Sequence, residues 1–90
     1  MAQHKSAAKR ARQAEKRRVR NRDIKTRMRT LVKVFQQALA TDGAEAAEKK
    51  LRIAERELRR AASKGVIPKQ RASRSVSRLA KQLQRLRSSA

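Results

Sequence analysis

Several residue types are scarce in this chain of 90 residues. It contains no cysteine and no tyrosine, and its only histidine is His4. Without cysteine it can form neither a disulfide framework nor a thiolate metal site. The side chains that most often exchange protons or attack substrates are therefore nearly missing. We predict that the protein is not an enzyme and that it binds no metal, cofactor or small-molecule substrate.

Long apolar runs are absent as well. No stretch of about 20 apolar residues is available to cross a membrane. A secretory signal would need an apolar segment of roughly 7 to 15 residues after its basic start, and here the basic start continues without one. The N-terminus resembles an organelle transit peptide in composition but lacks the apolar stripe of such a peptide. We therefore expect a cytoplasmic protein.

Basic residues dominate the charged residues of the chain. Lys and Arg number 27 against 7 Asp and Glu, which gives a formal net charge of +20. Residues 1–33 carry 13 of the basic residues, and residues 64–90 carry 8 and no acidic residue. Residues 34–63 are nearly neutral, with 6 basic and 5 acidic residues. Because a chain this charged repels itself, we expect its two ends to bind a polyanion, and nucleic acid supplies negative charge most densely.

Three hydrophobic stripes predict three helices. In each stripe the apolar residues recur at intervals of three and four, which places them along one side of a helix. The stripes consist of Ile24, Met28, Leu31, Phe35 and Ala38; of Ala47, Leu51, Ala54, Leu58 and Ala61; and of Ala72, Val76, Leu79, Leu83 and Leu86. Stripes of matching period can pack on one another as antiparallel helices. We predict helices over residues of about 5–40, 44–64 and 68–87.

The breaks between the stripes contain residues that begin and end helices. Thr41 or Asp42 can cap the second helix, with Glu45 placed to complete a capping box. Gly65 can adopt the positive φ that commonly follows a helix end. Pro68 can open the third helix, where its missing N–H costs nothing.

The first helix can run unbroken because residues 1–42 contain neither Pro nor Gly. We therefore predict an all-α fold, a three-helix antiparallel bundle with a long, basic N-terminal helix that extends beyond it. Residues 1–90 are expected to form one domain, with a basic arm over residues 1–22 and the bundle over residues 23–88. On the middle helix, acid–base pairs spaced i to i+4 predict a solvated face. These pairs are Glu45–Lys49, Glu48–Arg52 and Glu55–Arg59.

The two basic ends contain the candidate binding residues. Cations on the first helix point to several sides, so phosphates can be met nearly all round. Those on the third helix recur beside the apolar stripe, which leaves one face for the bundle and one for phosphate. The predicted contacts are Lys5, Ser6, Lys9, Arg10, Arg12, Lys16, Arg17, Arg18, Arg20, Arg22, Lys25, Arg29, Lys64, Lys69, Arg71, Arg74, Arg78 and Lys81. The alternatives are a solvated tail for the first group and an ordinary exposed face for the second.

The aromatic content narrows the choice of partner. Phe35 is the only aromatic residue, so unpaired bases have no aromatic ring to stack on and the protein should bind backbone and shape. Structured RNA fits best, and an architectural, nucleoid-type DNA-binding protein remains open from charge alone. A cationic membrane-surface helix is a third hypothesis, but it needs an apolar face that residues 2–18 lack. We also expect residues 1–20 to fold only on RNA.

Three segments carry a recognisable pattern. Residues 5–12 are Lys-Ser-Ala-Ala-Lys-Arg-Ala-Arg, residues 25–30 are Lys-Thr-Arg-Met-Arg-Thr, and residues 61–70 are Ala-Ala-Ser-Lys-Gly-Val-Ile-Pro-Lys-Gln. Together with Ala72-Ser73-Arg74 and Ser77-Arg78-Leu79, they resemble the bacterial small-subunit ribosomal protein S-twenty family over nearly the whole chain. Pro68 and Gln70 stand where that family usually has His and Asn, so contacts through those side chains are not carried over.

The resemblance has its own implications for fold and partner. It implies a three-helix bundle that binds the small subunit's 16S-type ribosomal RNA (rRNA) directly, with the long first helix set between RNA helices. It also implies a structural role in rRNA folding and subunit assembly on the cytoplasmic ribosome. Few contacts with other ribosomal proteins and none with membranes are expected.

Overall fold

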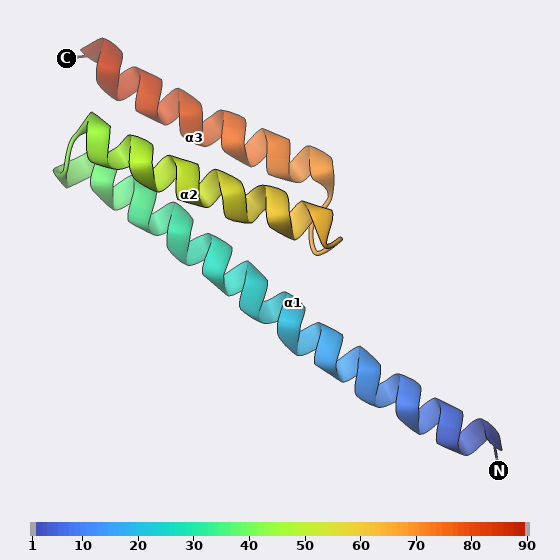
Figure 1. The fold of residues 1–90 in the computed structure, drawn as a ribbon. Helices are drawn as coiled ribbons and strands as arrows, with labels where there is room; N and C mark the ends of the chain where they lie inside the picture. Colours follow the sequence, from blue (N-terminus) through green and yellow to red (C-terminus); the bar gives the residue numbers. More distant parts are fainter. Residues whose placement is uncertain (1, 90) are drawn as a thin grey trace.

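The computed structural model describes the backbone of residues 2–89 and the side chains of residues 5–89. Within that part of the chain there are three helices and no strands: α1 (Ala2–Thr41), α2 (Ala44–Ser63) and α3 (Lys69–Ser89). The all-α prediction is confirmed, and each helix boundary lies within three residues of the predicted one. Consecutive helices run antiparallel, and α1 continues well past the other two (Figure 1).

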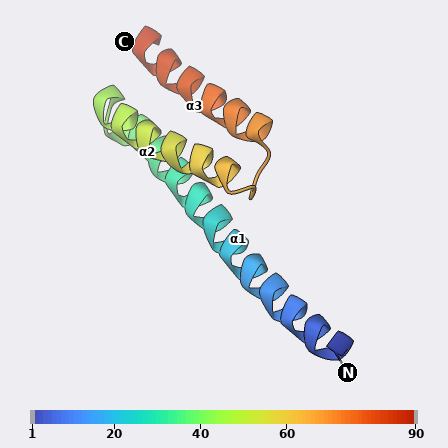
Figure 2. The ribbon, with the colours of Figure 1, turned by 45° about the vertical axis from the view of Figure 1, so that its right-hand side comes forward.

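Helix α1 gives the molecule its elongated shape. Its 40 residues form one continuous helix, and the principal extents of the molecule are 69 × 22 × 12 Å. At about 1.5 Å per residue, α1 alone is about 60 Å long. Only its C-terminal half lies beside α2, and its N-terminal half projects away from the bundle in both views (Figure 1, Figure 2).

The three helices do not close equally on one another. Helix α2 packs against both α1 and α3, whereas α1 and α3 make few direct contacts. Small residues on α2 allow this close packing, because Ala47, Ala54 and Ala61 are all buried against its neighbours. Leu51 and Leu58 fill the spaces between the alanines. The bundle is therefore centred on α2, with one side between α1 and α3 left open.

The hydrophobic core is built from the predicted stripes. From α1 it takes Met28, Phe35 and Ala38, and Phe35 has no exposed surface. From α3 it takes Ala72, Leu79 and Leu83, while the other stripe residues are partly buried. Ile67 is also buried, at 4% exposure, although it belongs to no stripe. Helical periodicity could not identify Ile67, because it lies in the turn between α2 and α3.

The hydrophobic core does not extend to the N-terminal part of α1. Ile24 is the first residue of the stripe, and it is only partly buried. Every side chain from residue 5 to residue 18 is exposed. This part of α1 has no core of its own and no packing partner within the described chain.

The α1–α2 turn differs from the predicted cap. The residue before α2 is Gly43, with φ of 94°, and no side chain caps the helix start. The Thr41 hydroxyl instead lies 2.9 Å from the Gln37 carbonyl and 3.1 Å from the Asp42 carboxylate, to which it can donate. The prediction that Thr41 or Asp42 caps α2 with Glu45 is wrong, because Thr41 belongs to the last turn of α1 and its hydroxyl is used there.

The α2–α3 turn agrees more closely with the prediction. Gly65 has φ of 77°, and its N–H donates to the carbonyl of Ala62 at 3.0 Å. The next N–H, from Val66, donates to the carbonyl of Ala61 at 2.9 Å, which completes a Schellman motif. Pro68 lies one residue before α3, and its carbonyl accepts a hydrogen bond from the Ala72 N–H. Pro68 therefore precedes the helix instead of opening it.

Ion pairs link the exposed faces of the helices. The predicted Glu48–Arg52 and Glu55–Arg59 pairs form, at 3.1 and 2.9 Å. No Glu45–Lys49 ion pair occurs among the described residues, so that prediction is wrong. Helix α3 is tied to α2 by Arg87, whose guanidinium lies 2.7 Å from the Glu48 carboxylate.

Candidate nucleic-acid interface

All the predicted contact residues are exposed. Those from Lys5 to Arg29 lie on α1, Lys64 lies in the α2–α3 turn, and those from Lys69 to Lys81 lie on α3. None is used in the hydrophobic core, so all of these side chains are accessible to a partner. Their binding to RNA stays a prediction, and their placement shows which of them can act together.

The first group lies on residues 5–18 of α1, the wholly exposed part of the predicted basic arm, and from here on the arm means these residues. Successive helical residues are rotated by about 100°, so Lys9, Arg10 and Arg12 point to different sides of the rod. No other element lies beside the arm (Figure 1), and all its side chains are exposed, so its cations are accessible on several sides of the helix. A polyanion could therefore contact the arm from more than one side at once.

Two acidic side chains on α1 offset part of this charge. The Arg18 guanidinium lies 2.6 Å from the Glu15 carboxylate. This hydrogen-bonded ion pair lowers the pKa of Glu15 and raises the pKa of Arg18. Asp23 lies 3.8 Å from Arg22. Arg18 and Arg22 are thus the predicted contacts whose charge is already partly compensated within the described chain.

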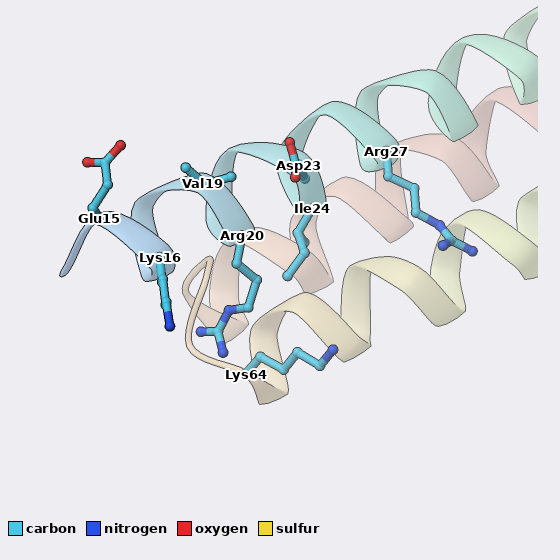
Figure 3. Close-up of a pocket in the computed structure, with 8 residues that line it drawn as sticks. All are labelled: Glu15, Lys16, Val19, Arg20, Asp23, Ile24, Arg27 and Lys64. Atoms are coloured by element: carbon cyan, nitrogen blue, oxygen red, sulfur yellow. The ribbon is translucent and has the colours of Figure 1, made fainter. Parts of the chain in front are cut away.

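The second group lies where the arm leaves the bundle, and we call it the elbow. A hollow of about 620 Å³ opens there, between α1 and the α2–α3 turn. Figure 3 shows Lys16 and Arg20 of α1 on the same side as Lys64 of the turn, whereas Glu15 and Asp23 point the other way. Residues separated by more than 40 positions in sequence thus present cations to one space.

Arg27 also lines the elbow and was missed by the sequence prediction. Its guanidinium lies 3.5 Å from the carboxylate of Glu57 on α2. The side chain of Glu57 is only 14% exposed. The spacing of Lys16, Arg20 and Arg27 by four and seven residues places all three on one face of α1, and this signal could have identified Arg27. Its ion pair joins α1 to α2 just below the elbow.

The third group lies across the open side of the bundle. Lys25 and Arg29 of α1 face a groove that Arg71 of α3 lines from the other side. Arg74, Arg78 and Lys81 continue along α3, all exposed. The structure therefore gathers the predicted residues into the arm, the elbow and the α1–α3 side, while the first residues of the arm remain far from α3 (Figure 2).

The composition of the surface defines a class of protein. No buried polar or charged side chain occurs in the described part of the chain, and residues 5–89 contain no cluster of His, Cys, Asp or Glu able to hold a metal. Across the described residues, no helix is long and apolar enough to span a membrane. A small helical protein with a projecting cationic rod has the surface that is typical of proteins that bind a polyanion.

Comparison with known proteins then identifies the family. The family model described as ribosomal protein S20 matches residues 2–84, and the chain belongs to this family. The prediction made from the sequence resemblance is confirmed. Members of this family have a structural role, so the prediction that the protein is not an enzyme is confirmed as well.

Individual relatives match along nearly their full length. The small ribosomal subunit protein bS20 of Syntrophobacter fumaroxidans is 48% identical over 86 residues, which cover 96% of this chain and 100% of the relative. The protein of the same name from Helicobacter acinonychis is 48% identical over 79 residues, covering 88% of this chain and 89% of the relative. That from Wolinella succinogenes is 47% identical over 79 residues, covering 88% and 87%.

Proposed function

We propose that this chain is a structural constituent of the small ribosomal subunit that binds the subunit's rRNA directly through α1 and α3. The observation that carries the proposal is the arm, a fully exposed cationic helix without any core of its own. A helix of this kind gains little from its own protein, and rRNA supplies the phosphates that its charges require. The names of the relatives support the small subunit as the place of assembly.

The mechanism follows from the distribution of charge. The arm enters between RNA helices and neutralises phosphates on several sides, while the elbow and the α1–α3 side hold RNA that passes the bundle. Helix α2 is turned from the RNA, because its exposed acids pair with its own arginines and with Arg87 of α3. By lowering the repulsion between rRNA segments, the protein stabilises their folded arrangement and promotes assembly. Few contacts with other ribosomal proteins are needed for this role.

Salt dependence of binding tests the mechanism. If about eight phosphates are neutralised, the logarithm of the binding constant should fall against the logarithm of salt concentration with a slope of roughly −6 to −7. Titration of a small-subunit rRNA fragment with the full chain at several salt concentrations measures this slope. A slope near zero would exclude binding through phosphate neutralisation.

Matched variants assign the slope to the arm. Replacing Lys9, Arg10 and Arg12 by Gln keeps a good helix former at each position and should reduce the slope by about 2. The same replacement of Lys49, Lys50 and Arg56, exposed on α2, should leave it unchanged. Equal effects of the two triple variants would contradict the proposed orientation. Tighter binding to duplex DNA or to anionic vesicles than to rRNA at matched salt would favour the alternative partners.

A further inference from the structure

The open side of the bundle forms a groove between α1 and α3. Because α2 packs against both helices while they make few contacts with each other, α2 and the α2–α3 turn supply the floor between them. The groove has a volume of about 440 Å³. Sites for small ligands span roughly 300 to 1,000 Å³, so the groove has the capacity of a binding site.

The floor of the groove is apolar. It is formed by Met28 of α1, Leu58 of α2 and Ile67 of the turn, which are 9%, 5% and 4% exposed. Val32, which is partly buried, extends this surface along α1. Aliphatic and thioether side chains offer no hydrogen bond to a phosphate, so a phosphate would not rest on this floor. A flat group with an apolar face would displace water from it favourably.

The rims of the groove are cationic. Lys25 and Arg29 stand one turn apart on α1, and Arg71 stands on α3 across from them, one turn before the partly exposed Ser75. Within the described chain, none of these three cations pairs with a carboxylate, and no acidic residue lines the groove. The elbow differs in this respect, because Glu15 and Asp23 are among the residues that line its hollow, although both point away from its cations. The charge of the groove is therefore complementary to an anionic occupant.

We propose that the groove binds one unpaired nucleotide of rRNA, with its base on the apolar floor and its neighbouring phosphates on the cationic rims. A nucleotide carries both parts that the groove distinguishes, since the faces of its base are apolar and its phosphates are anionic. Duplex RNA keeps the faces of its bases stacked inside the helix and would leave the floor uncovered. The proposal rests on the rRNA binding proposed above and adds base contact to it, which the lack of aromatic residues alone did not predict.

The test fills the groove without removing a cation or a core residue. In Ser75→Phe an aromatic ring enters from α3 and occupies the space proposed for the base. We expect the affinity for small-subunit rRNA to fall about tenfold, equivalent to ~1.4 kcal/mol. Chemical probing of base edges should show one unpaired base that the wild-type protein protects and the variant leaves reactive. Protection of the rRNA backbone by the arm should be the same in the variant as in the wild-type protein.

Controls separate this effect from loss of the fold. Ser88→Phe places the same ring at an exposed position near the end of α3 and should retain wild-type affinity and base protection. If Ser75→Phe fails to fold, variants of the RNA test the proposal instead. Each unpaired base that the wild-type protein protects is removed in turn to leave an abasic site. The loss of one of these bases should weaken wild-type binding about tenfold.

The outcomes are distinguishable from those that test the function as a whole. A wild-type protein that does not bind rRNA removes the proposed function itself. A wild-type protein that binds rRNA but protects no unpaired base overturns the groove proposal alone. So does a folded Ser75→Phe variant that protects every base, or one that loses only the binding of another ribosomal protein.

Discussion

Gly65 shows at the scale of one residue how the α2–α3 turn is fixed. Its φ of 77° lies in the left-handed region, and no heavy atom beyond Gly65 and its two chain neighbours lies within 4 Å of the position that a Cβ would take. The cost of another residue there is therefore conformational and not steric. The turn that Gly65 permits also carries Lys64 to the elbow and Ile67 to the floor of the groove, so two proposed contact regions depend on it.

Substitution of Gly65 should measure that cost. We expect Gly65→Ala to reduce the free energy of unfolding by about 1 to 2 kcal/mol, because a left-handed conformation is unfavourable for a residue with a Cβ. Urea unfolding followed by circular dichroism gives the value. Gly65→Asn is the matched control and should cost less, since Asn tolerates this conformation better. An equal loss in both variants would contradict the conformational explanation.

Glu48 predicts a second effect at residue scale, on pH dependence. Hydrogen bonds and attraction, first from Arg87 and then from Arg52, hold the pKa of Glu48 below its ordinary value of 4.5. A carboxylate whose pKa is lowered by folding stabilises the fold above its unfolded pKa, and this contribution is lost as the pH falls through its folded pKa.

The corresponding variant is Glu48→Gln. It should melt at a lower temperature than the wild type at neutral pH, and the difference should shrink as the pH falls below 4.5. Glu45→Gln removes a carboxylate that joins no ion pair in the described chain and interacts only with the N-terminal end of the α2 dipole, so it should lower the melting temperature less than Glu48→Gln does. A Glu48→Gln difference that persists unchanged at about pH 2 would contradict the explanation.

The arm sets the behaviour of α1 at the scale of the element. The C-terminal half of α1 is held by the core around Phe35, whereas residues 5–18 are wholly exposed. Helical stability in water comes mostly from tertiary packing, and a segment without it opens easily. The two halves of one continuous helix should therefore differ greatly in local stability.

Hydrogen exchange should show this difference directly. We expect the amides of residues 5–18 to exchange rapidly in the free protein, while those near Phe35 and in α2 are protected. On binding rRNA the arm amides should become protected as well, because ordering then occurs on the partner. Strong protection of the arm without RNA would show that the helix is stable by itself and would contradict this prediction.

The helices were predictable from sequence because their signals are local. Each stripe repeats at three and four residues, and all the stripe residues except Leu86 lie in the core or pack against it in the structure. The cap at Thr41 failed because the hydroxyl had two possible uses, at the end of α1 or at the start of α2, separated by only a few residues. Which use prevails depends on where α1 ends, and periodicity does not determine an end to one residue.

The molecule as a whole is the predicted antiparallel bundle with a projecting first helix, but the sequence did not predict that the bundle is open between α1 and α3. Equal stripes favour a closed bundle, yet α1 and α3 each pack on α2 and leave a groove between them. The groove brings Arg29 and Arg71 to one site, although they are far apart in the chain. Relative helix placement depends on how small and large residues interlock in three dimensions, so the elbow and the groove could not be found from spacing alone.

The net charge of +20 affects the stability of the whole molecule. Repulsion among exposed cations opposes the folded state, and few acids are present to offset it. Raising sodium chloride from about 0.1 M to about 1 M shortens the screening length from about 10 Å to about 3 Å. The melting temperature of the free protein should therefore rise over this range. A fall would show that the ion pairs outweigh the repulsion.

Because α1 is a single helix without a break, it fixes the arm relative to the bundle in two ways. It sets the azimuth, which is the direction in which each arm side chain points around the helix axis, and the reach, which is the distance of the arm from the bundle along that axis. One Ala inserted after Asn21 would rotate every arm cation by about 100° and advance it by about 1.5 Å. Seven inserted residues would restore the azimuth to within about 20° but lengthen the reach by about 10 Å.

The single insertion could lower the affinity for rRNA without changing the melting temperature of the bundle. In that case α1 holds two RNA segments at a fixed distance and a fixed angle from each other. Wild-type affinity in the single-insertion variant would mean that only the charge of the arm matters. The continuity of α1 would then not determine the spacing of the RNA segments, and the arm would act only by neutralising phosphates.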